Sequence, residues 1–495
     1  MNYTSTRSPA NDPISAQEAI KRGIAPDGGL YMPMQIPVLT LAEIDVLCTK
    51  SYAARAAYLL GKFLTDYPTE DLLTECGQVY SSARFPGGAA PVVRVDDTLH
   101  FLELWHGPTA AFKDMALQIM PRLLSGALRQ TGEKRTALIL VATSGDTGKA
   151  ALEGFKDVKQ TKIQVFYPVD GVSPVQKLQM ATQTGDNVSV MALRGNFDDA
   201  QSGVKNIFGD DAIREELAAH GVFLSSANSI NWGRLVPQIV YYVSAYCDMV
   251  KNGSIGAGEQ IDVCVPTGNF GNIFAAYLAK TMGLPIGRLI CASNTNNVLT
   301  DFLSTGVYDR NRAFHTTMSP SMDILISSNL ERLLFLLFGH ERTAACMNAL
   351  KKMGCYALSR DELSIIQKTF VGYFTDEENT ARIIRETWEK YGYLIDPHTA
   401  VAVGAAEQYE KDRGTKRKLL VVSTASPYKF ASDVYASLYG ETPKDPLTAG
   451  ERLSEKTGTE IPAPLADIAK RTVRFTQETD AAHMAEEVLR FATGD

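Results

Sequence analysis

Short apolar runs alternate with helix-sized segments through the middle of the chain, and this alternation constrains the fold more than any other feature. The runs lie at residues 138–142, 163–167, 188–193, 261–265 and 289–292, with a later one at 419–422. Strands that alternate with helices form βαβ units, in which parallel strands are buried on both faces and so lack a polar side. The pattern predicts an α/β protein with open, mostly parallel sheets.

The rest of the chain has other patterns. Thr40 and Glu43 have the spacing of a capping box, which marks a helix near the N-terminus. Residues after 300 carry Leu, Met, Asn and charge at helical spacing, with few strand signals. We therefore expect four parts: a mainly helical N-terminal domain (1–95), the first part of the α/β core (96–300), a helical insertion (301–385), and the completion of the core with C-terminal helices (386–495).

Composition excludes several classes of protein. The 495 residues include 49 Lys and Arg and 56 Asp and Glu, a net charge of −7, so we expect no nucleic-acid partner. The apolar run 333–338 is far shorter than the roughly 18 residues that cross a membrane, so no membrane association is expected. A polar N-terminus and seven scattered cysteines without a C-x-x-C pair are typical of a cytoplasmic protein with no metal site.

A lysine stands where a strand-like run gives way to a helix. Lys113 follows the run 99–105 and a Gly-Pro turn, and a helix is expected over 114–129. Partial burial near a helix N-terminus disfavours the ammonium form and makes the amine a better nucleophile. The alternative is a solvated lysine in the first turn of that helix.

Two loops after predicted strands have the composition of anion-binding turns. In residues 266–272, PTGNFGN, the glycines let successive N–H groups point at one anion beside a helix N-terminus. Residues 143–149, TSGDTGK, are not a Walker A loop, because Thr143 replaces its first glycine and Ala150 follows the lysine. Either loop can equally be an ordinary capped turn.

Three further segments carry polar side chains at predicted element ends. Asn228, Asn231 and Arg234 precede a helix and suit a second anion, although a cap with a surface arginine explains them as well. Thr424 follows a buried strand, where α/β proteins often contact ligands, or belongs to a plain polar turn. His398 is either a proton shuttle or a structural histidine.

These segments, taken in order, resemble the threonine synthase family over nearly the whole chain. The matching motifs are YTSTR (3–7), GIAPDGGLYMP (23–33), HGPTAAFKD (106–114), TSGDTG (143–148), NSINWGR (228–234), PTGNFGN (266–272), DPHTAVAVG (396–404) and TASPYKF (424–430). The chain length and the expected helical insertion are similar to the longer, bacterial and fungal type of the family.

The resemblance implies a fold-type II pyridoxal phosphate (PLP) enzyme with two open, mostly parallel sheets. It implies conversion of O-phospho-L-homoserine and water to L-threonine and phosphate, by loss of phosphate from Cγ and addition of water at Cβ. Lys113 is then the Schiff-base lysine and removes the Cα proton. By motif position, the other cofactor contacts are Asp146, Gly268, Asn269, Phe270, Gly271, Asn272 and Thr424, and the substrate contacts are Ser144, Thr147, Asn228, Asn231 and Arg234.

Two positions depart from the family pattern, which often has Leu at Ala110 and His at Ser426. The change at Ser426 removes a ring from the expected wall beside Thr424. Two other functions stay open: a PLP lyase of the same fold that yields a keto acid, and a non-catalytic amino-acid-binding homologue. We expect a monomer or a homodimer.

Overall fold

The computed structural model describes residues 1–9, 13–143, 145–169, 172–414 and 417–494, and its core is a pair of open sheets. One sheet has six strands, parallel except for the edge strand β3, in the order β13-β10-β9-β14-β4-β3. The other has five parallel strands in the order β15-β7-β6-β5-β8. The predicted α/β class with two mostly parallel sheets is therefore confirmed.

The strands of the larger sheet are β3 (Val92–Arg94), β4 (Leu99–Glu103), β9 (Ile261–Pro266), β10 (Ile286–Ser293), β13 (Phe370–Phe374) and β14 (Leu419–Ser423). Those of the smaller sheet are β5 (Thr136–Ala142), β6 (Thr161–Pro168), β7 (Val188–Arg194), β8 (Val222–Ser225) and β15 (Glu478–Asp480). All six predicted runs lie within strands, whereas β3, β8, β13 and β15 were not predicted.

Helices cover both faces of each sheet, which explains the continuous apolar runs. On β9, Val263 packs in one cluster with α12 and α13, whereas Cys264 packs in another with α18 on the opposite face. On β5, Ile139 and Leu138 likewise belong to clusters on opposite faces. Neither face of these strands meets water, so a polar alternation would leave buried groups unpaired.

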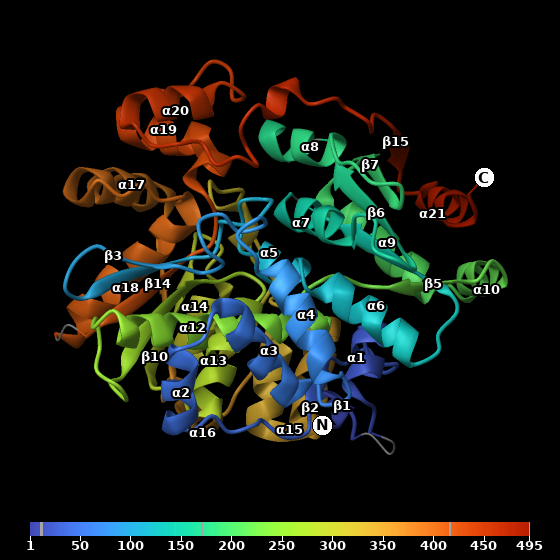
Figure 1. Cartoon of the computed structure of the whole chain (residues 1–495), viewed down its shortest axis with the longest axis horizontal. Coiled ribbons are helices and arrows are strands. Elements are labelled where there is room, and N and C mark those ends of the chain that lie inside the picture. The colour runs from blue at the N-terminus through green and yellow to red at the C-terminus, as the bar shows by residue number, and fades with distance from the viewer. Residues whose placement is uncertain (10–12, 144, 170–171, 415–416, 495) are drawn as a thin grey trace.

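The helices beside the larger sheet are α11 (Trp232–Leu235), α12 (Pro237–Lys251), α13 (Gly271–Met282), α14 (Val298–Thr305), α17 (Glu377–Tyr391), α18 (Pro397–Arg413), α19 (Ala431–Tyr439) and α20 (Ala449–Thr457). Those beside the smaller sheet are α6 (Met120–Gln130), α7 (Asp146–Phe155), α8 (Pro174–Ala181), α9 (Phe197–Gly209), α10 (Asp211–Ala219) and α21 (Met484–Thr493). The short α5 (Asp114–Leu117) lies beside α7 near the middle of the molecule (Figure 1).

The N-terminal part packs below both sheets and their helices in the view of Figure 1. It consists of α1 (Ala16–Arg22), α2 (Leu41–Cys48), α3 (Tyr52–Phe63) and α4 (Thr69–Val79), with a small sheet of β1 (Tyr3–Ser5) and β2 (Tyr31–Pro33). The capping box at the start of α2 is confirmed, because Thr40 and Glu43 each accept a hydrogen bond from the other's backbone N–H.

The segment 301–385 is not wholly helical, which corrects the expectation of a helical insertion. It contains α15 (Leu330–Met353) and α16 (Arg360–Gln367), a short 3-10 helix η1 (Pro320–Met322), and a two-stranded sheet of β11 (Val307–Asp309) and β12 (Cys355–Ala357). It also contains β13, which pairs in parallel with β10. Gly372 interrupts the apolar pattern of β13, because α14 passes too close for a side chain: a Cβ there would lie 2.8 Å from Thr300 Cα.

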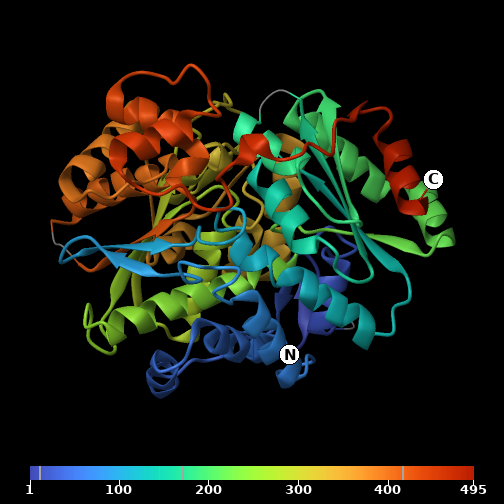
Figure 2. The same ribbon diagram turned by 45° about the horizontal axis from the view of Figure 1, so that its top comes forward.

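The C-terminal segment connects the part of the molecule around the larger sheet to the part around the smaller sheet. It runs from α20, above the larger sheet, across the top of the molecule to α21 beside the smaller sheet (Figures 1 and 2). Helix was expected from about 463 to 492, but α21 begins at Met484, and before it lie only the short η3 (Ile468–Lys470) and the edge strand β15. A strand of three polar residues has no readable periodicity. The four-part division by residue ranges stays a prediction.

None of the described helices is both long enough and apolar enough to cross a membrane.

Candidate active site

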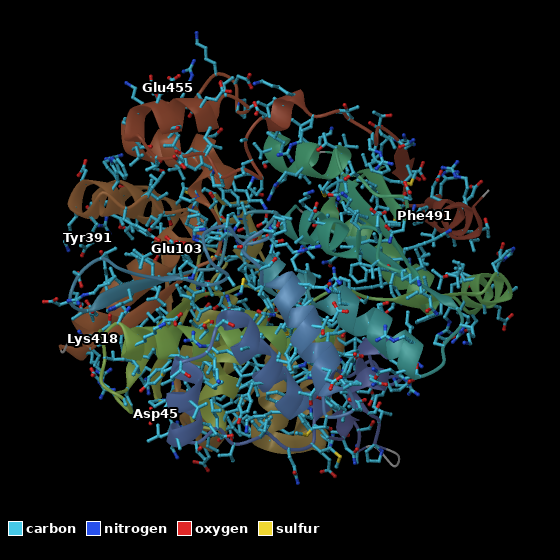
Figure 3. All side chains as sticks on the ribbon, viewed as in Figure 1. Asp45, Glu103, Tyr391, Lys418, Glu455 and Phe491 are labelled. Atoms are coloured by element: carbon cyan, nitrogen blue, oxygen red, sulfur yellow. The ribbon has the colours of Figure 1, made fainter. Side chains whose placement is uncertain are left out.

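The parallel strands of the larger sheet run from the outer edge of the molecule toward its middle. Lys418, which precedes β14, lies at that outer edge, whereas Glu103, the last residue of the parallel neighbour β4, lies farther inward (Figure 3). Ligands of open α/β sheets bind beyond the carboxyl ends of the strands. The segments that follow β4, β9 and β14 therefore meet near the middle of the molecule.

Backbone pairing brings two of the predicted site residues together. The chain around Lys113 runs antiparallel to the chain after β14: Ala111 bridges Ala425, and the Phe112 N–H donates to the Thr424 carbonyl at 2.8 Å. Lys113 occupies the N-cap position of α5. Lys113 and Thr424 thus lie on adjacent backbones.

The two departures from the family pattern lie on these same two backbones. The Ser426 N–H donates to the Ala110 carbonyl at 3.0 Å. The Ser426 side chain is buried and caps the following 3-10 helix, η2 (Pro427–Phe430). A small residue at Ala110 and a capping hydroxyl at Ser426 leave the pairing that holds Thr424 intact.

The amine of Lys113 is buried among polar groups. The residue is 9% exposed; its Nζ donates to Ser321 Oγ at 3.1 Å and lies 3.5 Å from Asp146 Oδ2. Burial lowers the pKa of Lys113 to about 8, Asp146 opposes that shift, and the charges of Arg234 and Lys429 add to it. The lysine is therefore not the solvated side chain of the alternative interpretation, and its amine is readily available in the neutral form.

Asp146 lies between two lysines at the start of α7. Its Oδ1 accepts hydrogen bonds from Gln176 Nε2 and from Lys429 Nζ, each at 2.8 Å. Burial alone would raise the pKa of Asp146, but the charges of Lys429 and Lys113 hold it well below its usual range. Asp146 is consequently a carboxylate, and its charge is balanced within the site.

The loop between β9 and α13 leaves its backbone donors available. Its carbonyls are anchored: Gly268 O accepts from Ser327 Oγ at 2.7 Å, and Asn269 O accepts from the Asn329 N–H at 3.0 Å. The N–H groups of Gly268, Asn269 and Phe270 donate to no other described residue. They precede the N-terminus of α13, which begins at Gly271, so the loop has the donors and the dipole that an anion needs.

Asn272, on the first turn of α13, adds a buried donor to this region. Its side-chain oxygen accepts hydrogen bonds from the hydroxyls of Tyr241 at 2.5 Å and Tyr242 at 2.6 Å. Its Nδ2 is buried and has no partner among the described residues. A buried amide without an acceptor is costly, which indicates that this region is built for a ligand with acceptor oxygens.

Replacing Gly268 with alanine is expected to weaken cofactor binding. The added Cβ would lie 2.7 Å from the Ser321 carbonyl oxygen and 3.3 Å from Met322 Cα, both backbone atoms that cannot rotate away. Overpacking of about 1–3 kcal/mol corresponds to a dissociation constant for PLP raised roughly 5- to 140-fold, measured by titration of the dialysed protein. Gly77→Ala in α4, where no atom lies within 4 Å, is the matched control and should bind PLP as tightly as wild type. If Gly268→Ala bound PLP as tightly as wild type, the prediction that this loop binds the cofactor phosphate would be contradicted.

Arg234 is a buried cation without a carboxylate partner. It is 6% exposed, and its Nη1 donates to the Ala227 carbonyl at 3.0 Å. No ion pair joins it to a described acidic residue, and burial lowers its pKa to about 10. Because an unpaired buried charge is costly, this guanidinium indicates an anion-binding site close enough to Lys113 to affect its pKa.

Asn231 is committed to the fold, which corrects its prediction as a substrate contact. Its Nδ2 donates to the carbonyls of Ile20 and Ser226, both at 3.0 Å, and its Oδ1 accepts from the Gly233 N–H. The side chain caps α11, is fully buried, and has both amide hydrogens donated within the fold. Asn231 lies next to the site, on the loop that carries Arg234. A helix cap and a ligand contact were therefore indistinguishable in the sequence.

The other predicted substrate contacts are less constrained. Thr147 lies half-buried in the first turn of α7, and Asn228 is half-buried before α11. Neither side chain donates a hydrogen bond to another described residue, so both stay candidates. Ser144 lies outside the described residues.

His398 holds the backbone of Ser321 and does not contact Lys113. Its Nδ1 lies 2.7 Å from Asp396 Oδ1, and its Nε2 accepts the Ser321 N–H at 3.2 Å. Since Nε2 accepts a hydrogen bond, Nδ1 carries the proton. Both ring nitrogens are engaged, which favours the structural interpretation over a proton shuttle.

Three residues of this region were missed from the sequence. Ser321 and Lys429 reach Lys113 and Asp146 from segments distant along the chain. Arg332 is fully buried and donates to the Tyr31 and Ile230 carbonyls, which fixes the loop before Arg234 against the N-terminal part. Lys429 stands inside a motif that the sequence did single out, but nothing local marks it as buried.

Comparison with known proteins gives the class of the chain. Residues 87–425 match the family described as pyridoxal-phosphate dependent enzyme, so the chain is a PLP-dependent enzyme of fold-type II. Residues 2–80 match the threonine synthase N terminus, and residues 399–488 match the threonine synthase C-terminal family. The chain belongs to the threonine synthase family.

Individual relatives agree with this membership. Threonine synthase of Pseudomonas aeruginosa is 37% identical, over 96% of this chain and 95% of the relative. Human threonine synthase-like 1 is 40% identical over 85% of this chain, which spans only 58% of that longer relative. The crystal structure of PLP-bound threonine synthase from Brucella melitensis is 37% identical, with a TM-score of 0.88 over 99% of both chains.

Proposed function

We propose that this protein converts O-phospho-L-homoserine and water to L-threonine and phosphate, with PLP attached to Lys113. One observation carries the substrate class: a loop with free backbone donors and a buried arginine without a described carboxylate partner both lie near one buried amine. The glycine loop before α13 suits the phosphate of the cofactor, which leaves Arg234 for a second anionic group. A substrate that carries its own phosphate supplies that group.

The residues proposed to hold PLP provide donors for its phosphate, an amine for its aldehyde and polar groups for its ring. They are Lys113, Asp146, Gly268, Asn269, Phe270, Gly271, Asn272 and Thr424. When bound, PLP acts as an electron sink for negative charge that develops on the substrate carbons. Thr424 would offer the bound cofactor a neutral hydroxyl in place of a negatively charged partner.

Lys113 has a second task in this proposal, which is to move protons. With a pKa of about 8, its amine is partly neutral near neutral pH and can accept a proton from the substrate Cα. Asp146 and Lys429 neutralise each other at 2.8 Å, so they hold the local charge steady while the lysine changes protonation.

Departure of phosphate from Cγ requires that its charge be neutralised. Arg234 is suited to this because its guanidinium has donors left after its bond to Ala227. Thr147 and Asn228 are proposed to bind the remaining substrate oxygens, and Ser144 is retained from its motif alone. Burial of Lys113 and Arg234 strengthens these interactions, because less water competes for the anion there.

An assay of products tests the proposal and separates it from the two alternatives. Incubated with O-phospho-L-homoserine, the PLP-loaded protein should form L-threonine and phosphate in equal amounts. Formation of 2-oxobutyrate with phosphate would support the lyase of the same fold. Absence of any turnover, with or without bound PLP, would support the non-catalytic homologue. L-Homoserine, which lacks the phosphate, is the matched control and should not react.

We also propose a cytoplasmic location. The seven cysteines form no disulfide among the described residues; all seven lie on helices or strands, and five of them are buried. Free thiols in such numbers are typical of a reducing compartment.

A further inference from the structure

Ser321 joins the two halves of the site at the amine of Lys113. Its Oγ accepts from Lys113 Nζ at 3.1 Å and donates to Asp146 Oδ2 at 3.4 Å. The lysine follows a strand of the larger sheet, and the carboxylate begins α7 beside the smaller sheet. The contact with Ser321 is the shortest polar contact of this amine with a described residue.

The backbone of Ser321 is held from both sides. Its N–H donates to His398 Nε2 at 3.2 Å, and its carbonyl oxygen lies against Gly268, where it would be 2.7 Å from an added Cβ. The His398 ring is in turn fixed by Asp396 at 2.7 Å. The hydroxyl therefore projects from a backbone that cannot adapt easily to the lysine.

A second set of contacts fixes the segment that leads into Ser321. Asp323 accepts hydrogen bonds from the Thr317 N–H at 3.0 Å, from Thr317 Oγ1 at 2.7 Å and from Asn294 Nδ2 at 2.8 Å. Ser319 is fully buried, and its Oγ accepts from the same Asn294 amide at 2.9 Å. The segment is thus a rigid turn clamped to the end of β10, and Ser321 is the residue of this turn that contacts the lysine.

We propose that Ser321 is a positioning residue that holds the amine of Lys113 whenever that amine is not bonded to the cofactor. A lysine stem has several rotatable bonds, and a free amine would otherwise leave the place where it must exchange protons. The Ser321 hydroxyl accepts a hydrogen bond from the amine and donates one to Asp146. Amine, hydroxyl and carboxylate therefore form one chain of hydrogen bonds with a single direction. This inference deepens the proposed function and rests on the proposed role of Lys113.

The decisive measurement follows Lys113 in the full chain without cofactor. Labelling of Lys113 by an amine-reactive reagent at a series of pH values, read by peptide mass mapping, gives the titration midpoint of this one amine. Ser321→Ala removes an acceptor that favours the charged amine, so the midpoint should fall by about 0.5–1 pH unit. Asp146, Arg234 and Lys429, the charged groups that act on the amine from α7, α11 and η2, stay in place.

Three variants make the result specific. Ser321→Thr keeps the hydroxyl and should keep the wild-type midpoint. Ser319→Ala makes the same substitution two residues earlier, without contact to Lys113, and should leave the midpoint unchanged even where it lowers the melting temperature. Ser321→Cys, nearly isosteric but a weak acceptor, should shift the midpoint like alanine, and it replaces that variant if Ser321→Ala does not fold.

The PLP-loaded protein gives a second readout. Ser321→Ala should lower kcat about 10-fold with little change in KM, and Ser321→Thr should restore most of it. An unchanged midpoint in folded Ser321→Ala, or an equal shift in Ser319→Ala, would overturn the inference. Because labelling needs no substrate, a shifted midpoint in a protein that makes no threonine would leave this inference standing and refute the proposed reaction.

Discussion

Lys113→Ala is expected to lower kcat by roughly 10³-fold or more, because one side chain is proposed both to attach the cofactor and to move the substrate proton. No other described lysine can take over. Lys429 is fully buried, but its Nζ already donates to the Thr109 carbonyl at 2.9 Å and pairs with Asp146 at 2.8 Å. Moving it toward the cofactor would leave the Asp146 carboxylate unbalanced.

The measurements for Lys113→Ala are the rate of threonine formation and the visible absorbance of the cofactor bound to a lysine. Both should be lost, whereas the far-ultraviolet circular dichroism should match wild type. Lys177→Ala, an exposed lysine on α8, is the control and should keep both. A Lys113→Ala protein that retains the absorbance band and turns over normally would place the reactive amine elsewhere and remove the basis of the proposed mechanism.

The parts of the fold that the sequence predicted are those specified by local pattern. The buried parallel strands were found because residues on both of their faces are apolar, so Val263 and Cys264 both indicate burial. Strands β13 and β15 were missed for two different reasons. Gly372 breaks the pattern of β13 to admit α14, and β15 is a three-residue strand that exists only through its pairing with β7.

The site divides in the same way. Lys113 and the glycine loop lie in local motifs that the sequence singled out, although spacing alone left a solvated lysine and an ordinary turn open, and their roles came from the family resemblance. Ser321 and Lys429 act through contacts with residues hundreds of positions away, and no local pattern marks them. Asn231 shows the converse error: an amide that caps a helix and an amide that binds a ligand look the same until its partners are known.

Arg234→Met is expected to separate catalysis from stability. Loss of the guanidinium should lower kcat/KM by roughly 10²–10³-fold, because the departing phosphate then lacks its cation. The free energy of unfolding of the ligand-free protein should stay unchanged or rise by about 1 kcal/mol, since the substitution removes a buried charge that has no carboxylate partner. Activity would therefore fall without loss of fold, which steady-state kinetics and chemical denaturation measure side by side.

Inorganic phosphate distinguishes an anion site from a merely tolerated charge. At 100 times its dissociation constant for the Arg234 site, phosphate should raise the free energy of unfolding of the wild-type protein by about 2.7 kcal/mol through that site. Most of this increase should be absent from Arg234→Met. Arg332→Met is the matched control, because this equally buried arginine donates to the Tyr31 and Ile230 carbonyls. Its loss leaves buried acceptors unpaired and should cost roughly 3 kcal/mol of stability. If Arg234→Met instead loses as much stability as Arg332→Met and keeps its kcat/KM, Arg234 is a structural cation and the second anion site does not exist.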